Sequence, residues 1–495
     1  MLLPSAALLP ALAPDRWREF GARLATIGLD AQCVGDILQH EELLLQPSPP
    51  PLRTWRLRRR ADAPGFAMRM LMFGDAVTRE EASLALGDRL LEALTGAGFI
   101  VSQQDGSLVS PFRLHVSGNT YAISDVPVCL PDSVFGVGSG ALLLRQAAPP
   151  GAYGRVLDLG CGAGLLALSL ASTAACSVGT DVNPRAVLMA RINAAINGIA
   201  NVEFRQGDLF EPVEGEKFDL IVSHPPFVAM PPSASPVAFL YGGTRGDELP
   251  LKILSHVRTL LNPSGRALLL AQWPDAEEQP LESRIRNVVG PTGLNVLVLN
   301  YPSVDPDGAC TLYASGTDPA LGETFASTTV RYRDHLDRLG IHRLQTAFVV
   351  VERTRQLNAW TVGIQIPEYG AGVTGSRIER ILAAQNLAAS GCDALLDAVL
   401  RLPEGAIFAE ERVLPDLSAP AIFLRLPSDA LSGPIRLNET AWALALTLHS
   451  AATVRDAIVQ FADARRIPFD SAAAELLPAI KRALLEGVVE PHAAD

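Results

Sequence analysis

The sequence predicts an α/β protein whose core is a mostly parallel sheet of seven strands, covered by helices on both faces. Two observations predict it. From about residue 151, short apolar runs alternate with amphipathic helical segments. The apolar runs are also continuous rather than alternating, which is typical of strands buried on both faces. The core is expected to carry an N-terminal helical and winged-helix-like module and a C-terminal mainly helical module.

The individual elements follow from turn residues and apolar periodicity. The expected strands, in chain order, read RVLDLG, CSVGTD, VEFRQG, DLIVSH, RALLLAQW, NVLVLNY and QTAFVVVERT. The helices between them read AGLLALSLAS, PRAVLMARINAAINGI and LPLKILSHVRTLL. A polar, helical excursion over about residues 303–343 precedes the last strand. We therefore divide the chain into residues 1–118, 119–355 and 356–495.

In the N-terminal module, residues 1–45 have helical spacing, and a further helix followed by two hairpins is predicted after them. Residues 78–98 have helical periodicity, and Thr78 and Glu81 have the spacing of a capping box. The hairpins are expected to turn at Asp105-Gly106 and at Gly118-Asn119. This order is typical of winged-helix-like folds, although a docking module that shapes a pocket would give the same pattern.

The C-terminal module changes to helical periodicity after about residue 356. Residues 438–491 predict three amphipathic helices and a short strand. Asn438 and Thr453 are plausible N-caps, because their side chains can accept a hydrogen bond from the first helical turn.

Composition disfavours several classes of protein. The 495 residues carry a net charge of −12 with a pI of about 5.2, which opposes a broad nucleic-acid-binding surface. The arginine run at residues 53–60 is the local exception, and a solvated surface is its simplest interpretation. The six cysteines are scattered without zinc spacing, so we predict no metal site and a reducing, cytoplasmic location. The apolar start lacks the basic region of a signal peptide, and no membrane segment is expected.

The strongest functional motif is Val156 to Gly164, VLDLGCGAG. A strand ends near Asp158, and a turn containing Gly160, Gly162 and Gly164 opens a helix. Glycines let the backbone approach a bound cofactor closely, and the helix N-terminus favours a carboxylate. The acid directly before the glycines argues against a nicotinamide-binding turn, which usually begins with its first glycine.

Two further acids follow at strand ends. Asp181 lies about twenty residues beyond the glycines, where an acid accepts hydrogen bonds from ribose hydroxyls. Asp208 follows the third strand. Together with their neighbours Asn183 and Leu209, these residues are predicted to contact the cofactor.

The fourth strand ends in His224-Pro225-Pro226-Phe227. With the glycine turn and the acids, this run resembles the class I, Rossmann-like S-adenosylmethionine-dependent methyltransferases. The Pro-Pro-aromatic site resembles their branch that methylates nitrogens on planar groups, such as release-factor glutamine and ribosomal guanine-N2 methyltransferases. The resemblance covers about residues 120–355. It implies S-adenosylmethionine as cofactor, with Asp158 near its ammonium end and Asp208 near its adenine amino group.

The resemblance also implies which residues bind the methyl acceptor. In this branch, the residue before the two prolines and the carbonyl after it accept hydrogen bonds from the target NH₂, and the aromatic packs on the planar group. We therefore predict His224, Pro225 and Phe227 as the catalytic set. The run from Asp132 to Gln146, DSVFGVGSGALLLRQ, resembles the segment that covers the cofactor or lines the substrate entrance, and its Phe135 is a predicted substrate contact.

His224 departs from the family, which has Asn or Asp at this position. A neutral imidazole can accept a hydrogen bond as Asn does, but with a pKa near 6.5 it can also take a proton. His224 is therefore either an acceptor or a general base, and a structural histidine is the remaining alternative.

The loop of residues 241–248 is expected to line the substrate crevice, because it follows the fourth strand at the carboxyl edge of the sheet. Arg245 could bind a substrate carboxylate, and Asp247 or Glu248 could bind a cationic group. Tyr241 is predicted as a further substrate contact. Helix-capping charges in a glycine-rich loop would explain the same residues.

These observations together predict N-methylation of a planar amine, amide or guanidine group. A small molecule or amino acid, as in secondary metabolism, fits the acidic pI and the unusual histidine. Protein glutamine or RNA methylation is the alternative, and nucleic acid fits the charge poorly. A non-catalytic scaffold that keeps the cofactor pocket is the rival from another class. The sequence does not predict the oligomeric state.

Overall fold

The structure is a computed structural model, and its residues form two compact units. It describes residues 8–38, 51–126, 130–136, 138–232, 234, 237, 239–275, 279–317, 322–355, 359–366, 373–411, 421–425 and 435–492. The first unit comprises residues 1–145, 151–354 and 361–365. The second comprises residues 146–150, 355–360 and 366–495.

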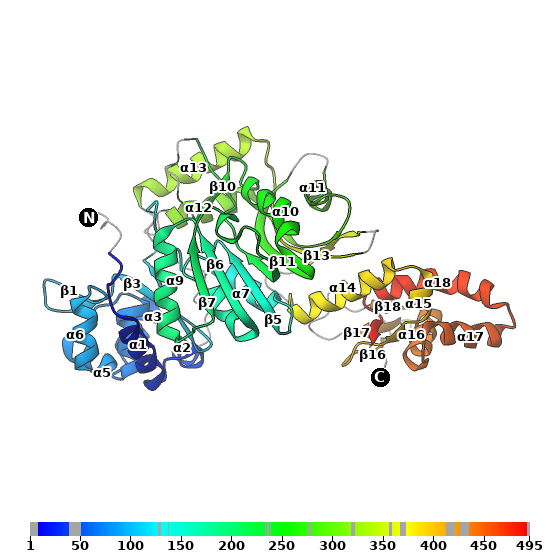
Figure 1. The fold of residues 1–495 in the computed structure, drawn as a ribbon, viewed down its shortest axis with the longest axis horizontal. Helices are drawn as coiled ribbons and strands as arrows, with labels where there is room; N and C mark the ends of the chain where they lie inside the picture. Colours follow the sequence, from blue (N-terminus) through cyan, green and yellow to red (C-terminus); the bar gives the residue numbers. More distant parts are fainter. Residues whose placement is uncertain are drawn as a thin grey trace. The chain divides into compact units, whose positions relative to one another are not determined.

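The first unit is built on one eight-stranded sheet (Figure 1). The strand order is β14-β12-β13-β11-β8-β5-β6-β7, and only β13 runs antiparallel to its neighbours. The α/β class and the mostly parallel sheet are thus confirmed. The strands are β5 (Tyr153–Leu159), β6 (Ala174–Asp181), β7 (Val202–Gln206), β8 (Phe218–Ser223), β11 (Leu261–Pro274), β12 (Leu294–Val304), β13 (Leu344–Arg353) and β14 (Thr361–Gln365).

The sheet has eight strands, whereas the sequence predicted seven; the additional strand is β14. β14 pairs parallel to β12 and lies beyond residue 355 in the chain. Its side chains are exposed or half-buried, because it is an edge strand with one neighbour. Its five residues, TVGIQ, form no continuous apolar run of the kind that marks the central strands of the sheet.

The helices that connect the strands cover the sheet as expected. Those of the core are α7 (Ser139–Ala147), α8 (Leu165–Leu170), α9 (Pro184–Asn197), α10 (Glu248–Leu260) and α11 (Leu281–Val289). The excursion before the last strand is a pair of contacting helices, α12 (Pro306–Thr317) and α13 (Glu323–Arg338). The strand order reverses at β5, between β6 and β8, and this switch point is where open α/β sheets bind ligands.

The N-terminal module has helices in both regions of predicted helical spacing, residues 1–45 and 78–98, and further helices between them. The helices are α1 (Pro14–Thr26), α2 (Ala31–Leu38), α3 (Pro51–Arg58), α4 (Ala63–Ala67), the π-helical turn η2 (Met68–Met72), α5 (Arg79–Leu86) and α6 (Asp88–Gly96). Residues 78–98 form α5 and α6 because Gly87, with φ of 80°, interrupts the helix. Both predicted hairpins are present, as β1 (Val101–Ser102) with β2 (Leu108–Val109) and β3 (Phe112–Ser117) with β4 (Thr120–Asp125).

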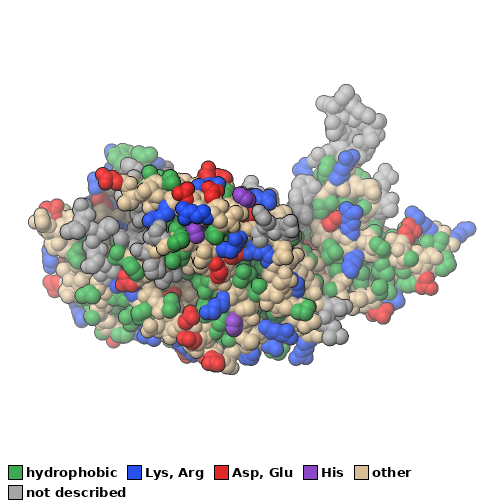
Figure 2. Space-filling model, turned by 90° about the horizontal axis from the view of Figure 1, so that it is seen from above, with side chains coloured by type: hydrophobic (Ala, Val, Ile, Leu, Met, Phe, Trp, Pro, Cys, Tyr) green, Lys and Arg blue, Asp and Glu red, His purple; other side chains and the backbone are tan. Residues whose placement is uncertain are grey.

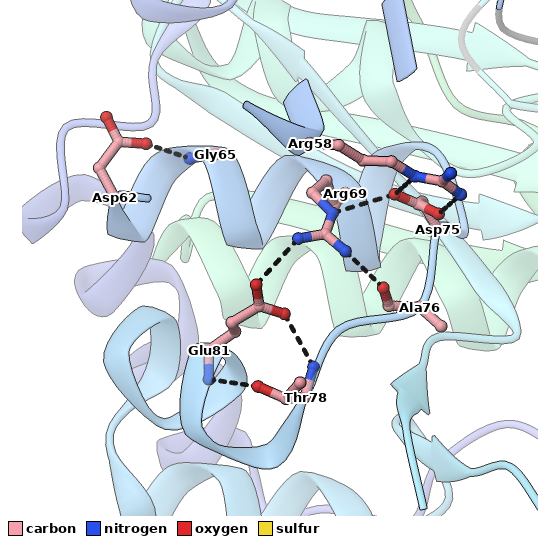
Figure 3. A network of polar contacts seen from close by, with 8 residues as sticks. All are labelled: Arg58, Asp62, Gly65, Arg69, Asp75, Ala76, Thr78 and Glu81. Atoms are coloured by element: carbon pink, nitrogen blue, oxygen red, sulfur yellow. Dashed lines mark hydrogen bonds and ion pairs between the residues drawn. The ribbon is translucent and has the colours of Figure 1, made fainter. Parts of the chain in front are cut away.

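The capping box predicted at Thr78 is present and belongs to a larger polar network (Figure 3). Thr78 Oγ1 accepts from the Glu81 N–H, and Glu81 accepts from the Thr78 N–H. Arg69 of η2 donates to Glu81 and to Asp75 at 3.1 and 3.0 Å. Asp75 also accepts from Arg58, so one carboxylate joins α3 to η2.

The N-terminal module shares its core with α9. Trp17 and Phe20 of α1 pack in one buried cluster with Met189 and Ile196 of α9. A Cβ at Gly21 would lie 1.9 Å from the Ile196 carbonyl oxygen, so the two helices meet backbone to backbone. Helix α9 therefore supports the N-terminal module. Its own N-terminus borders the predicted cofactor site, so the same helix also supports that site.

The arginine run at 53–60 is largely engaged in contacts within the chain. Arg53 is buried, Arg58 pairs with Asp75, and Arg60 pairs with Asp62. The Arg59 guanidinium lies over the Trp55 ring, 4.6 Å from its centroid. The face of the molecule in Figure 2 carries acidic and basic side chains interspersed.

The second unit contains α14 (Gly375–Ala389), α15 (Cys392–Leu396) and a three-stranded antiparallel sheet followed by three helices. Asn438 and Thr453 cap α16 and α17 as predicted, each accepting from a first-turn N–H. The short strand β19 (Glu490–His492) pairs with β15 (Val399–Arg401). The remaining elements are β16 (Ile407–Glu411), β17 (Ala421–Arg425), β18 (Ile435–Leu437), α16 (Glu439–Ser450), α17 (Val454–Arg465) and α18 (Phe469–Leu485). Within the described part of the chain, no helix has the length and apolar character that crossing a membrane requires.

Candidate active site

The glycine turn joins β5 to α8, and its three glycines are needed for two different reasons. Gly160 and Gly162 have φ of 76° and 53°, and nothing lies within 4 Å of where a Cβ would be. A Cβ at Gly164 would instead lie 2.8 Å from Ala190 Cβ and from the Phe204 ring. The first two glycines therefore face open space, whereas the third permits close packing of the helix on its neighbours.

Asp181, at the end of β6, holds this turn in place. Its Oδ2 accepts a hydrogen bond from the Gly162 N–H, and its Oδ1 accepts one from the Asn183 N–H, both at 2.9 Å. A carboxylate offers about four lone-pair sites, so each oxygen keeps acceptor capacity for a hydroxyl. Burial raises the pKa of Asp181.

Asp158 is the second carboxylate of the turn and is almost fully buried. Its Oδ2 accepts from the Ala167 N–H of α8 at 2.9 Å. Burial, with a smaller contribution from the negative charge of Asp181, raises the pKa of Asp158 to about 7. Two desolvated carboxylates close to each other are costly, and a bound ammonium group would relieve that cost.

Asp208 and Leu209 follow β7 at the same edge of the sheet. The Asp208 side chain is exposed and forms a loose ion pair with Lys252, N to O 3.6 Å. Leu209 has φ of 46°, in the left-handed region that a branched residue seldom adopts. Such strain persists only where the surroundings impose it, and it is common at functional sites.

These residues fit S-adenosylmethionine. The open glycine turn admits a ligand against the backbone, and Asp181 has the acceptor capacity for ribose hydroxyls. A positive group would stabilise the buried carboxylate of Asp158, and the cofactor's ammonium is such a group. The predicted cofactor residues thus meet at one edge of the sheet, at the ends of β5, β6 and β7.

The His-Pro-Pro-Phe run begins where β8 ends, at Ser223. Ser223 Oγ donates to the Leu159 carbonyl at 2.8 Å, which ties the end of β8 to the start of the glycine turn. Pro225 is buried, and His224 and Phe227 are half-buried. The His224 and Phe227 rings meet edge to face, with centroids 5.6 Å apart.

His224 is held as a neutral imidazole. Burial lowers its pKa from 6.5 to about 4. No hydrogen-bond partner of its ring is found among the described residues. Near neutral pH one ring nitrogen is therefore unprotonated and can accept a hydrogen bond from a ligand.

The segment before α7 is fastened beside the site by several bonds. Asn183 Nδ2 donates to the Asp132 carbonyl, and the Val134 N–H donates to Asp125, both at 2.9 Å. Asp125 also forms a largely buried ion pair with Arg185. Within this segment, the exposed Phe135 ring stacks on Phe239, with centroids 5.4 Å apart.

The loop predicted to bind substrate follows β10 (Tyr241–Gly243), which pairs with β9 (Val228–Ala229) directly after Phe227. The pairing brings the loop to the expected edge, but its polar side chains contact other parts of the chain. Asp247 is buried and pairs with Arg284, and Glu248 accepts from the N–H groups of Arg245 and Gly246.

The two other predicted contacts of this loop are also engaged. The Arg245 guanidinium donates to the Leu339 and Asp275 carbonyls at 3.4 and 3.2 Å. The Tyr241 hydroxyl bonds the Tyr332 hydroxyl of α13 at 2.8 Å. In this arrangement these side chains hold the loop to its neighbours.

The α12–α13 pair is a contributor that sequence reasoning left unassigned. Cys310 of α12 and Leu336 of α13 share a buried cluster with Val228 and Ala229. Phe227 packs against the same cluster. The excursion therefore forms a wall behind the aromatic of the acceptor site. Its amphipathic periodicity was visible, but nothing in the sequence indicated what it covers.

Fold and site together define a class I methyltransferase architecture. Residues 132–288 match the family model described as the methyltransferase small domain. Among curated relatives, the release factor glutamine methyltransferase of Aliivibrio fischeri is 50% identical over 76 residues, which is 15% of this chain and 27% of that protein. That of Xylella fastidiosa (strain 9a5c) is 33% identical over 167 residues, 28% of this chain and 59% of that protein.

A protein of Methanocaldococcus jannaschii, named as a protein N5-glutamine methyltransferase, is 32% identical over 146 residues. These residues make up 28% of this chain and 71% of that protein. The chain therefore belongs to the class I S-adenosylmethionine-dependent methyltransferases of this glutamine-methylating branch. It spans 27% and 59% of the length of the two bacterial relatives, and the alignments leave most of its own length unmatched.

Proposed function

We propose that this protein transfers the methyl group of S-adenosylmethionine to the NH₂ nitrogen of a neutral planar group. The observation that carries the proposal is the neutral imidazole of His224, which lies beside Phe227 and next to the glycine turn and has no hydrogen-bond partner among the described residues. When bound, the cofactor supplies an activated methyl group. The nitrogen would form its new bond to carbon as the sulfur–carbon bond breaks, with S-adenosylhomocysteine as the leaving group and one N–H proton passing to solvent water.

The residues of the chain act by positioning in this proposal. His224 and the Pro225 carbonyl accept the two N–H bonds of the target, and the Phe227 face packs on its plane. Orienting two reactants can supply a large part of a rate enhancement. Asp158, Gly160, Gly162, Gly164, Asp181, Asn183, Asp208 and Leu209 hold the cofactor.

The low pKa of His224 favours an amide or aryl amine over a guanidinium. A guanidinium stays protonated up to a pH of about 12 and must lose a proton before attack. A base whose own pKa is about 4 is too weak to take that proton. A neutral NH₂ needs only an acceptor before attack, which is what an uncharged imidazole offers.

Among neutral groups, we propose a carboxamide of a protein or peptide. The support is the branch to which the chain belongs, whose matched relatives are named as protein glutamine methyltransferases. A small molecule is the second candidate. It is favoured by His224, because the residue differs from Asn at the very position that meets the acceptor.

The experiment is a transfer assay with S-adenosylmethionine carrying a deuterated methyl group. Protein and small-molecule fractions of an extract are incubated separately, and label is located by mass spectrometry. Label that acid hydrolysis releases as methylamine from the protein fraction supports a side-chain carboxamide. Label confined to the small-molecule fraction selects the second candidate.

The non-catalytic scaffold is tested by the same assay. Binding of S-adenosylhomocysteine with no transfer to any fraction would favour the scaffold and contradict the proposed activity. Gly162→Val serves as the control, because a side chain there would fill the open face of the turn.

A further inference from the structure

Gly140, in the first turn of α7, touches the ring of His224. A Cβ built on Gly140 would lie 2.4 Å from both Cε1 and Nε2 of His224 and 2.9 Å from Cδ2. Real Cβ atoms do not approach other atoms so closely. Those three ring atoms are the nearest neighbours of that position, so the imidazole occupies the space that a side chain would fill.

The backbone of Gly140 gives no other reason for a glycine. Its φ lies outside the left-handed region, and the residue belongs to a regular helix of nine residues. Alanine is the better helix former at such a position. The contact with His224 is therefore the feature that an added methyl group would disturb.

The contact also determines which ring nitrogen of His224 can face the substrate. Nε2 and Cε1 are turned toward α7, so the far edge of the imidazole is covered by the helix. Nδ1 is the nitrogen that remains for a substrate N–H. Nδ1 is separated from Cα by the same number of bonds as the amide oxygen of an asparagine, so it can accept at the corresponding place.

We propose that Gly140 is the positioning residue that lets a histidine serve at the first position of the Pro-Pro-Phe site. By lacking a side chain, it accommodates the outer edge of the ring and leaves Nδ1 as the acceptor for the substrate NH₂. Gly140 touches no reacting atom and acts through His224. The inference rests on the proposed function, since it assigns His224 the role of acceptor.

The test is a double-mutant cycle of Gly140→Ala and His224→Asn. Alanine at 140 strikes Cε1 and Nε2, which asparagine lacks, so the double variant relieves the two closest contacts. On the acceptor that the labelled assay identifies, we expect Gly140→Ala to lower kcat about 10²-fold, the loss of one oriented group, with KM changed less. The double variant is expected to regain about tenfold or more.

Two other glycines are control positions. A Cβ at Gly96, in helix α6 and outside the site, would have no atom within 4 Å, so Gly96→Ala should retain the wild-type rate. A Cβ at Gly136 would strike His115, which bonds Ser124 rather than the acceptor. The defect of Gly136→Ala should therefore not be relieved by His224→Asn.

A measurement without substrate separates this inference from the proposed function. Long-range ¹H–¹⁵N spectra of the wild-type protein report which nitrogen of His224 carries the proton. We expect the Nε2–H tautomer, with Nδ1 unprotonated, and a disturbed signal in Gly140→Ala. The spectra keep the inference testable if no acceptor is found or if Gly140→Ala does not fold.

Three results would overturn the inference. They are an Nδ1–H tautomer, a Gly140→Ala variant with wild-type kcat and KM, and a double variant that is no faster than Gly140→Ala. Absence of methyl transfer combined with the Nε2–H tautomer would instead contradict only the proposed function.

Discussion

The cofactor half and the acceptor half of the site differ in how they are built. At the ends of β5, β6 and β7, the key contacts are backbone hydrogen bonds to carboxylates, such as Gly162 N–H to Asp181. Around His224 and the loop of residues 241–248, the contacts are between side chains of distant segments, such as Asp247 with Arg284 and Gly140 with His224. A half defined by local backbone geometry can be recognised from a motif, whereas one defined by tertiary contacts cannot.

The largest effect is expected at the glycine turn. Gly162→Val should abolish binding of S-adenosylhomocysteine, because a branched side chain is strained at φ of 53° and would occupy the open face of the turn. Calorimetry measures the affinity, and circular dichroism checks that the fold is retained. Unchanged affinity in a folded variant would show that the cofactor binds elsewhere.

His224→Ala should lower the chemical step by about 10²–10⁴-fold, the usual effect of losing one group that acts on a proton or N–H in the transition state. Affinity for S-adenosylhomocysteine should remain nearly intact, because the cofactor contacts lie on other strands. Single-turnover rates at saturating cofactor measure the effect. If His224→Ala reacts at the wild-type rate, His224 has only a structural role.

Asp181→Ala should weaken cofactor binding by about 1.5–3 kcal/mol through the loss of charge-assisted hydrogen bonds. The variant also releases the N–H of Gly162, so the turn itself should loosen. Calorimetry with S-adenosylhomocysteine gives the number. A change below about tenfold would mean that the ribose is held by other residues.

A smaller effect is expected from Asp158. Its pKa of about 7 means that it is partly protonated near neutrality. A cationic ligand favours the charged carboxylate and so lowers this pKa on binding. Affinity for the cofactor should therefore rise as the pH increases from 6 to 8, with release of a proton. Calorimetry in buffers of different ionisation enthalpy detects that proton, and Asp158→Asn should remove the pH dependence.

The sequence was sufficient for the parts of the fold with regular patterns. Seven of the eight strands of the large sheet, the capping box at Thr78 and the N-caps Asn438 and Thr453 were all predicted from sequence patterns and capping chemistry. The sequence did not indicate β14, a half-exposed edge strand without a continuous apolar run. It also did not indicate the break at Gly87, because the apolar periodicity of residues 78–98 fits one continuous helix. The pairing of β14 with β12 depends on residues that are remote in the chain.

The site was predicted unevenly for the same reason. The motif residues at strand ends meet at one edge of the sheet, although their roles stay predictions. For Arg245 and Asp247, charge in a loop suggested substrate binding, whereas both side chains are engaged with other segments of the chain. The importance of Gly140 could have been suspected from the FGVGSG run, but its partner, 84 positions away, could not.

The pH dependence of methyl transfer by the wild type and by His224→Asn tests the central claim most directly. Because burial lowers the pKa of His224 to about 4, the imidazole is uncharged down to a pH of about 5. We predict that, at saturating cofactor over the whole pH range, the wild-type rate is flat between pH 6 and 8 and that the Asn variant keeps much of that rate with the same flat profile. A wild-type rate that falls on the acidic side of pH 7, together with a slow Asn variant, would contradict the account by showing that His224 removes a proton.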